Sequence, residues 1–445
     1  MKSSDMLHGS PGKSLFLFAL PMIIGNIFQQ FYTIIDSVIV GRFVGEEALA
    51  AVGASYALTT VFISVAIGGG VGASVLTSQY LGAKNYSRMK TSIYTALFTF
   101  LGISIILGLA GVLFSSGIMR WLNTPENILD EAALFLRIYF MGLPFLFMYN
   151  VLAAVFNSMG KSRIPLYLLI FSSVLNVILS IVTVCVLHLG VAGVAWSTLI
   201  AQGISAILSF TILMKYLKSF EKRIAFKIYD LSVLGKMVKI AVPSIIQQSI
   251  VSIGMMLVQS VVNGFGSEVL AGYSAAMRIE SICVVPLAAV GNAVSTFTAQ
   301  NIGAGQKDRV RKGYFSAYLI VAAFAVVICF ALVQFHTPII STFLNKESSL
   351  LALQTGTAYL KFMGFFFGLI GLKMITDGLL RGAGDMKIFT IANLVNLSIR
   401  VFVAFQFAPV WGVAAVWYAV PMGWTANYLL SFVRYLSGKW KNIKI

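Results

Sequence analysis

One aspartate lies inside an apolar run near the start of the chain. Asp36 stands between the apolar pairs Ile34–Ile35 and Val38–Ile39, at the far end of a run that begins at Leu15. A run of this length is typical of a transmembrane helix, and a carboxylate inside one costs a few kcal/mol or more unless it faces a protein cavity or a partner. We therefore interpret Asp36 as a functional carboxylate. The alternative is an interfacial residue at a helix end.

Other charged side chains also fall inside apolar runs. Arg278 and Glu280 share one run, Arg400 lies in another, and Lys373 precedes Asp377 by one helical turn in a third. The Lys373 and Asp377 spacing suits either a buried salt bridge or a coupling site. For the remaining three, the alternatives are neutralisation or snorkelling toward an interface, and a role in gating or substrate contact.

The composition excludes a soluble globular protein. Hydrophobic residues make up 58% of the 445 residues and charged residues only 11%, and the mean hydropathy is +0.89. Such a chain cannot supply a polar exterior, so we expect an integral membrane protein. The three cysteines and three histidines are too scattered to predict a disulfide framework or a metal cluster.

Apolar runs of about 20 residues predict an all-α protein with about twelve transmembrane helices. The predicted spans are 15–40, 48–80, 91–116, 132–157, 164–187, 190–214, 240–263, 270–301, 314–335, 355–380, 387–408 and 411–436.

The net charge of +17 follows the predicted topology. Most lysines and arginines lie in alternate connections, above all in the stretch 215–239, whereas the opposite connections carry little beyond Arg42, Arg120 and Lys346. Cytoplasmic connections retain basic residues, so we expect a plasma-membrane protein with both termini in the cytoplasm. This pattern explains the positive charge without nucleic-acid binding.

The chain repeats itself at a spacing of 221 to 224 residues. The similar strings are 18–23 with 240–245, 46–54 with 267–275, 77–83 with 298–304, 156–164 with 380–388, and 190–196 with 412–418. This regularity predicts two homologous six-helix bundles, residues 1–214 and 240–445, joined by a basic cytoplasmic linker at 215–239. An even number of spans per bundle implies a pseudo-two-fold axis along the membrane normal.

Two six-helix halves, an aspartate late in the first helix, and the paired strings QYLGA (79–83) and QNIGA (300–304) together resemble the multidrug and toxic compound extrusion (MATE) family. The resemblance covers essentially the whole chain and is closer to the branch with an aspartate on the first helix (DinF-like). It implies an antiporter, not an enzyme, that exports organic cations or other amphipathic compounds in exchange for protons or sodium ions. No cofactor is implied, and we expect a monomer in the bilayer.

Carried over residue by residue, the resemblance implies a coupling site made of Asp36, Asn150, Asn176, Ser180 and Thr198. Asn176 and Ser180 lie four positions apart and therefore share a helix face. Ser180 stands where many relatives have an aspartate, which weakens the case for a tightly bound sodium ion, because hard cations prefer several charged oxygens. Sodium at Asp36 stays possible on this pattern, and proton coupling is the favoured interpretation.

A second branch of the family uses a glutamate on the seventh helix, and the predicted seventh span, 240–263, has no acidic residue. Asp377 could correspond to the other acidic position of that branch. Aromatic and methionine side chains could line a pocket for amphipathic cations or simply face lipid. They are Phe362, Met363, Phe365, Phe366, Phe367 and Met374.

Two other function classes compete with export of amphipathic compounds. A flippase for a lipid-linked oligosaccharide would use the same architecture, but a pyrophosphate substrate favours a cluster of arginines or lysines in the cavity, and few cations lie within the predicted spans. A membrane-embedded enzyme would need clustered acids, histidines or a metal motif at one membrane face, and the sequence shows none.

Overall fold

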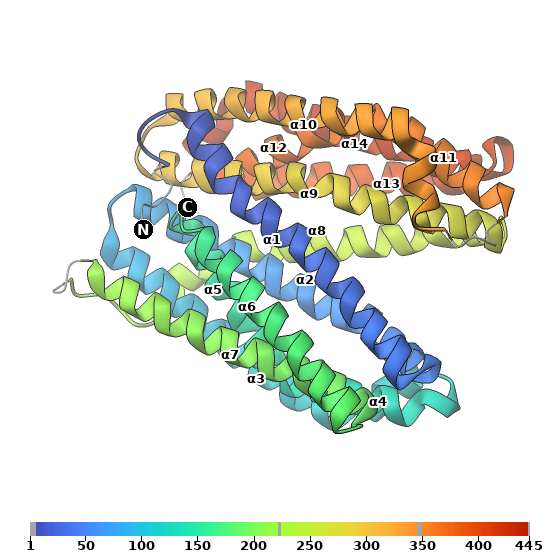
Figure 1. Ribbon diagram of the computed structural model, residues 1–445. Helices are drawn as coiled ribbons and strands as arrows, with labels where there is room; N and C mark the ends of the chain where they lie inside the picture. Colours follow the sequence, from blue (N-terminus) through green and yellow to red (C-terminus); the bar gives the residue numbers. More distant parts are fainter. Residues whose placement is uncertain (1–5, 221–223, 345–348, 444–445) are drawn as a thin grey trace. The chain divides into compact units, whose positions relative to one another are not determined.

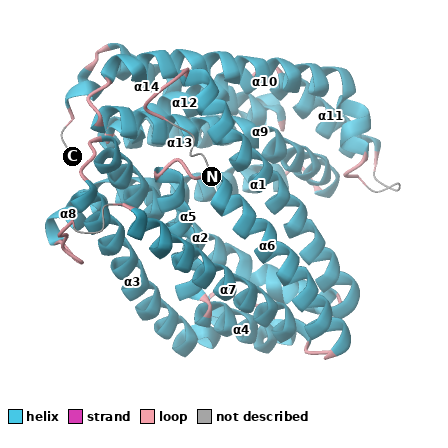
Figure 2. Ribbon diagram, turned by 60° about the vertical axis from the view of Figure 1, so that its left-hand side comes forward, coloured by secondary structure: helices cyan, strands magenta, loops and turns pink. Residues whose placement is uncertain are grey.

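The computed structural model describes residues 6–220, 224–344 and 349–443, and these residues form long helices joined by short connections (Figures 1 and 2). The first half contains α1 (Pro11–Ile39), the short π-helix η1 (Val40–Val44), α2 (Glu46–Gly82), α3 (Tyr86–Trp121), α4 (Glu126–Met141), α5 (Leu143–Ser158), α6 (Arg163–Ser180), the π-helix η2 (Ile181–Val186) and α7 (Gly190–Ser219). The second half contains α8 (Leu231–Asn263), α9 (Ser267–Gly303), α10 (Lys307–Ser341), α11 (Leu350–Gly364), α12 (Phe367–Ala383), α13 (Met386–Trp411), α14 (Ala414–Leu436) and the short 3-10 helix η3 (Lys439–Asn442).

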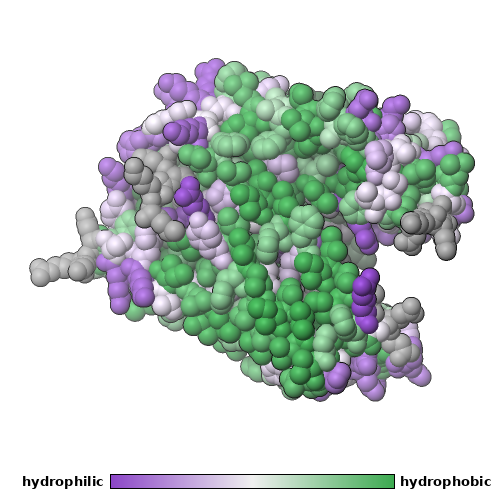
Figure 3. Space-filling view, in the orientation of Figure 1, coloured by the Kyte–Doolittle hydropathy of each residue, from purple (hydrophilic) through white to green (hydrophobic). Residues whose placement is uncertain are grey.

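The described helices confirm the predicted membrane class. Nine of them are long and apolar enough to cross a bilayer, or up to eleven spans if each of two bent helix pairs counts as one. Helix α14 occupies the place of the last predicted span. Large apolar side chains such as Leu113 and Val327 are exposed on the bundle surface, as expected for contact with lipid. Figure 3 shows hydrophobic side chains over the middle of the helices and hydrophilic ones near their ends.

Two predicted spans are broken in the structure. Helices α4 and α5 replace the span predicted at 132–157 and meet at an angle of 49°, and α11 and α12 replace the span at 355–380 with an angle of 56°. Gly142 separates α4 from α5, and Pro144 lies in the first turn of α5. Proline lacks the N–H that would continue the preceding helix, so a break is expected there. The second break, at Phe365 and Phe366, has no proline.

The sequence repeat extends to the backbone. Helices α2 and α9 contain 37 residues each and begin at equivalent positions of the repeat. Left-handed glycines recur in the same register: Gly45 pairs with Gly266, and Gly160 pairs with Gly384. Only glycine adopts these positive φ angles without strain, so the two halves end and begin their helices at matching points.

Contacts group the described chain into two compact units, one comprising Ile24–Ile245 and the other comprising the residues up to Ile23 together with Ile246–Ile445. The division into bundles 1–214 and 240–445 with linker 215–239 stays a prediction. The contacts show one feature that this prediction does not contain. Helix α1 begins in the second unit and ends in the first, and helix α8 begins in the first unit and ends in the second. Each of these helices contains a proline just before the change, Pro21 in α1 and Pro243 in α8.

Hydrogen bonds hold the start of the chain on the second unit. The guanidinium of Arg309 donates to the carbonyl oxygens of Met6 (3.2 Å), His8 (2.8 Å) and Gly9 (2.7 Å). The Asn301 amide donates to the same Met6 carbonyl at 3.0 Å. Arg309 therefore acts as a clamp that fixes the N-terminal segment before α1.

The basic connection between the halves packs along α3. Lys90 Nζ donates to the Phe220 carbonyl at 2.9 Å, and the Ser87 hydroxyl donates to the Ala225 carbonyl at 2.7 Å. At its end, the Asp230 carboxylate accepts the backbone N–H of Ser232 at 2.8 Å and so caps α8. This hydrogen bond is the main cause of the lowered pKa of Asp230.

Candidate functional site

A polar cluster joins α6 to α7 within the first unit. The Asn176 amide donates to Thr198 Oγ1 at 3.0 Å, and the Ser180 hydroxyl donates to Asn176 Oδ1 at 3.1 Å. The hydroxyl oxygens of Ser180 and Ser197 lie 2.7 Å apart. Asn176, Ser180 and Ser197 are buried. Three of the five residues predicted for the coupling site, Asn176, Ser180 and Thr198, thus meet in one hydrogen-bonded group.

Local sequence explains why these side chains meet. Asn176 and Ser180 are one turn apart on α6, and Ser197 and Thr198 each donate to the Val194 carbonyl of α7. Just after Ser180 the helix widens into the π-helix η2, where Thr183 donates across to the Gly193 carbonyl at 2.9 Å. π-turns inside membrane helices often mark functional sites.

The structure does not bring Asn150 into this group. Its amide donates to the Leu146 carbonyl of its own helix, α5, at 2.8 Å. The Asp36 side chain lies outside the described residues, although its backbone belongs to the part of α1 that packs in the same unit as the cluster. Sequence reasoning missed Ser197. Its position beside Thr198 at the start of α7 was the available signal.

The cluster offers neutral oxygens only. Ser180, Ser197 and Thr198 supply hydroxyls and Asn176 supplies an amide, so the charge for a bound proton or cation has to come from a carboxylate. Among the described side chains, no group of three or more histidine, cysteine, aspartate or glutamate residues could hold a metal ion. The arrangement therefore suits hydrogen bonding to a single acid.

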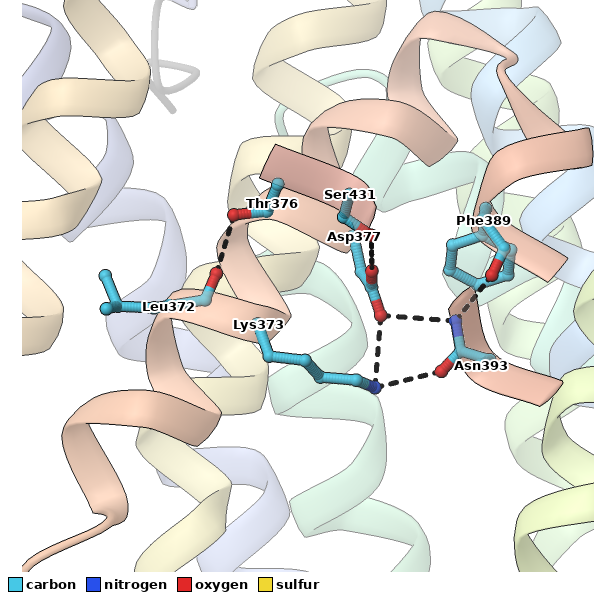
Figure 4. A network of polar contacts seen from close by, with 7 residues as sticks. All are labelled: Leu372, Lys373, Thr376, Asp377, Phe389, Asn393 and Ser431. Carbon is cyan, nitrogen blue, oxygen red and sulfur yellow. Dashed lines mark hydrogen bonds and ion pairs between the residues drawn. The ribbon is translucent and has the colours of Figure 1, made fainter. Parts of the chain in front are cut away.

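A second polar network lies in the other unit (Figure 4). Lys373 Nζ and Asp377 Oδ2 on α12 form an ion pair at 3.1 Å. Lys373 also donates to Asn393 Oδ1 on α13 at 3.0 Å, and the Asn393 amide donates to Asp377 Oδ2 at 3.2 Å. The Ser431 hydroxyl of α14 donates to Asp377 Oδ1 at 3.0 Å. Both charges are thus paired and hydrogen-bonded, and the network ties α12 to α13 and α14.

The other three charged residues of the predicted secondary sites separate in the structure. Arg278 is exposed on α9, whereas Glu280, two positions further on, is buried and accepts a hydrogen bond from the Tyr359 hydroxyl of α11. Arg400 lies half-buried on α13. Arg278 and Glu280 therefore point to different surroundings.

The predicted aromatic group divides in a similar way. Phe362 and Phe366 line a groove of about 590 Å³ together with Trp411 and Tyr418. Ring contacts at 4.9 Å join Phe362 to both Phe366 and Tyr418. Met363 and Phe367 are instead buried, Phe365 is exposed, and Met374 is half-buried on α12.

Comparisons with known proteins agree with this architecture. The model of the family MatE matches residues 21–182 and 243–406, which correspond to the two repeats. Over 451 residues, the chain is 30% identical to the "Probable multidrug resistance protein YpnP" of Bacillus subtilis (strain 168), covering 100% of this chain and 99% of that protein. The "Probable multidrug resistance protein YoeA" of the same organism is 31% identical over 457 residues, covering 97% and 95%.

Among solved structures, an outward-facing multidrug resistance MATE family transporter of the MOP superfamily superimposes with a TM-score of 0.91. It is 21% identical in sequence, and the match covers 100% of this chain and 99% of that one. The likeness shows that the fold is shared. The family match over both halves and the two relatives at 30% and 31% identity show that this chain belongs to the MatE family of secondary transporters.

Proposed function

We propose that this chain is a proton-coupled multidrug exporter that moves organic cations or other amphipathic compounds out of the cell by alternating access. Family membership supports transport, and the names of two relatives of similar length support multidrug export. The observation that supports the coupling role is the hydrogen-bonded cluster of Asn176, Ser180 and Thr198, in which Asn176 and Ser180 are buried, in the unit that contains the Asp36 segment.

Asp36 is the carboxylate that the neutral cluster requires. Burial of a carboxylate disfavours its charged form, whereas hydrogen bonds from amides and hydroxyls favour that form, and this balance sets whether such a group exchanges protons near neutral pH. In the proposed cycle, a proton from outside binds Asp36 and promotes substrate release. Loss of the proton to the inside then resets the N-terminal helices for a new substrate.

One sequence feature favours protons over sodium as the coupling ion, and another favours the DinF-like branch of the family. Ser180 replaces a second carboxylate beside Asn176, which removes charge that a sodium ion would use. Helix α8 contains no acidic residue, so the glutamate of the other branch is missing. We further propose a monomer in the plasma membrane with both termini in the cytoplasm, as the distribution of basic connections indicates.

The test is efflux of a fluorescent lipophilic cation from proteoliposomes, first under a pH gradient and then under a sodium gradient. Wild-type protein is expected to drive uphill transport with the pH gradient. The Asp36→Asn variant should insert and remain monodisperse but lose uphill transport. Asp130→Asn is the control, because Asp130 is an exposed carboxylate on α4.

Three outcomes would count against the proposal. Uphill efflux by Asp36→Asn at the wild-type rate would remove Asp36 from coupling. Transport driven by sodium alone would contradict proton coupling. Transport of the cation under neither gradient would favour a lipid-linked substrate, which vesicles containing a fluorescent lipid-linked oligosaccharide would then test.

A further inference from the structure

Glu280 is a buried carboxylate that the proposed mechanism does not use. It lies on α9 with 8% of its surface exposed and accepts a hydrogen bond from Tyr359 on α11. The Tyr359 ring is itself fully enclosed and packs edge-on against Tyr273 at 5.6 Å and Trp417 at 5.7 Å. These two aromatic neighbours thus hold the phenol hydroxyl on the carboxylate.

Arg400 provides the opposing charge from α13. It interacts electrostatically with Glu280, Tyr273 and Tyr359, although no ion pair is found between it and Glu280 among the described residues. Its Nε atom is buried and has no hydrogen-bond partner in the described part of the chain. Arg400 is therefore close to the carboxylate but not fixed on it.

Two buried amides continue this polar group toward α14. Asn427 is fully buried, and neither its Oδ1 nor its Nδ2 atom has a partner among the described residues. Asn396 Oδ1, one helical turn from Arg400, also lacks one. Gly423 brings the helices together here, since a Cβ at this position would clash with Asn396 Oδ1 and lie 2.8 Å from Arg400 Cγ.

Buried polar atoms in native proteins are almost always hydrogen-bonded, and where protein partners are missing, ordered water supplies the bonds. Unsatisfied amides deep inside a membrane bundle are especially costly. Gly423 on α14 contacts Asn396 and the Arg400 side chain of α13, and Asn427 follows Gly423 by one turn, so the unpartnered amide atoms lie along one stretch of the α13–α14 contact. This is the environment that internal water requires.

We propose that Glu280, Tyr359 and Arg400 form a hydrated proton-binding site inside the second unit, with water held by Asn396 and Asn427. This inference rests on the proposed function, and it adds a second titrating carboxylate to Asp36. A proton from water converts the Glu280 carboxylate into a carboxylic acid and is later returned to water. Protonation cancels the attraction between Glu280 on α9 and Arg400 on α13.

The charges of the site select a proton over other ligands. The Arg400 guanidinium repels sodium and divalent cations, while Glu280 repels anions, so the ligand must be small and must change the charge of the acid itself. The other titratable groups that face Glu280 are Tyr273 and Cys283 on its own helix and Tyr359 on α11. Ordinary phenols and thiols titrate at about pH 8.5 to 10, well above ordinary carboxylic acids at about pH 4.

Asp377 does not fill this role. Its two carboxylate oxygens already accept from Lys373, Asn393 and Ser431. A counter-charge in direct contact makes that carboxylate part of a closed network, whereas Glu280 has a single phenol donor and a cation at a distance. The two acids of the second unit therefore differ in their freedom to bind a proton.

Infrared difference spectroscopy of the purified protein across a pH titration tests the proposal directly. Carboxylic-acid bands from buried side chains should appear as the pH falls. Glu280→Gln should abolish one component of these bands and leave the component that Asp36→Asn removes. Glu268→Gln is the matched control, since Glu268 lies on the same helix but is exposed. The control should retain both components.

Two further variants keep the test decisive if Glu280→Gln does not fold. Tyr359→Phe removes the hydrogen-bond donor and should shift the pH midpoint of the Glu280 component by a measurable amount. Asn427→Leu replaces the amide by an apolar side chain of similar volume and should reduce the exchange of internal water, measured as loss of the weakly hydrogen-bonded water bands. A folded wild-type protein without a carboxylic-acid band, or an unchanged midpoint in Tyr359→Phe, would overturn the proposal.

The outcome is separable from that of the proposed function. The infrared bands report proton binding even if the protein moves no lipophilic cation in vesicles. Conversely, proton-driven efflux that is lost in Asp36→Asn but unchanged in Glu280→Gln would leave the exporter standing and remove Glu280 from its cycle.

Discussion

Individual polar residues in this protein fall into two kinds. Some belong to closed networks in which every charge has a direct partner, as Lys373 and Asp377 do. Others, such as Glu280 and Asn427, are buried with few partners or none among the described residues. Closed networks hold helices together, whereas open ones can change their protonation at low cost. Sequence spacing suggested the Lys373–Asp377 pair, but burial and partners distinguish the two kinds.

The closed network predicts an asymmetry between single and double substitutions. Lys373→Met leaves the Asp377 carboxylate buried without its counter-charge and should destabilise the protein by about 3 to 5 kcal/mol. Combining it with Asp377→Asn removes the unpaired charge and should recover most of that loss. Thermal unfolding in detergent, followed by size-exclusion chromatography, measures both. A double variant no more stable than Lys373→Met alone would contradict the interpretation.

At the scale of elements, the helices approach each other through small residues. On α9 and α12, Gly291 and Gly378 lie in backbone contact, and Gly382 contacts the carbonyl of Ser295 in the same way. Such stripes of small residues let membrane helices pack closely, because dispersion contacts and not water exclusion drive their association. The hydrophobic pattern predicted these helices well, since apolar length alone identifies a span. It did not predict the breaks between α4 and α5 or between α11 and α12.

Close packing of α9 on α12 predicts a strong effect of one methyl group. A Cβ at Gly378 would clash with the Gly291 carbonyl oxygen, so Gly378→Ala should force the helices apart and cost about 1 to 3 kcal/mol. Gly102→Ala on α3 is the control, because nothing lies within 4 Å of its added Cβ. Alanine favours helix there and should not destabilise. Equal losses of melting temperature in both variants would show that the crossing is not tight.

At the scale of the whole molecule, two helices connect the compact units. Helix α1 passes from the second unit to the first after Ile23, and α8 passes the opposite way after Ile245. Pro21 and Pro243 precede these points at equivalent positions of the repeat. Proline removes a helical hydrogen bond and allows bending, so each helix can adapt when the units move. The proposed alternating access would use bending at both prolines.

Removing the proline inside α1 should therefore slow transport without unfolding the protein. Pro21→Ala restores a helical hydrogen bond and is expected to reduce the initial efflux rate several-fold while raising the melting temperature or leaving it unchanged. Pro11→Ala is the control, since Pro11 is the first residue of α1, where proline costs nothing. Efflux rates in proteoliposomes at fixed pH gradient compare the two. A Pro21→Ala rate equal to that of Pro11→Ala would contradict this role of Pro21.

The sequence by itself determined the membrane class, the repeated halves and the family. Apolar length, basic connections and recurring strings are local signals, and they survive without any knowledge of packing. It also pointed to Asn176 and Ser180, which lie one turn apart, and to Thr198, which the family resemblance added to them. Only the tertiary structure decided that Ser197 joins them, that Asn150 bonds within its own helix, and that Glu280 faces Tyr359 and not Arg278. Hydrogen bonds between distant helices depend on their rotation and depth, and a single sequence records neither.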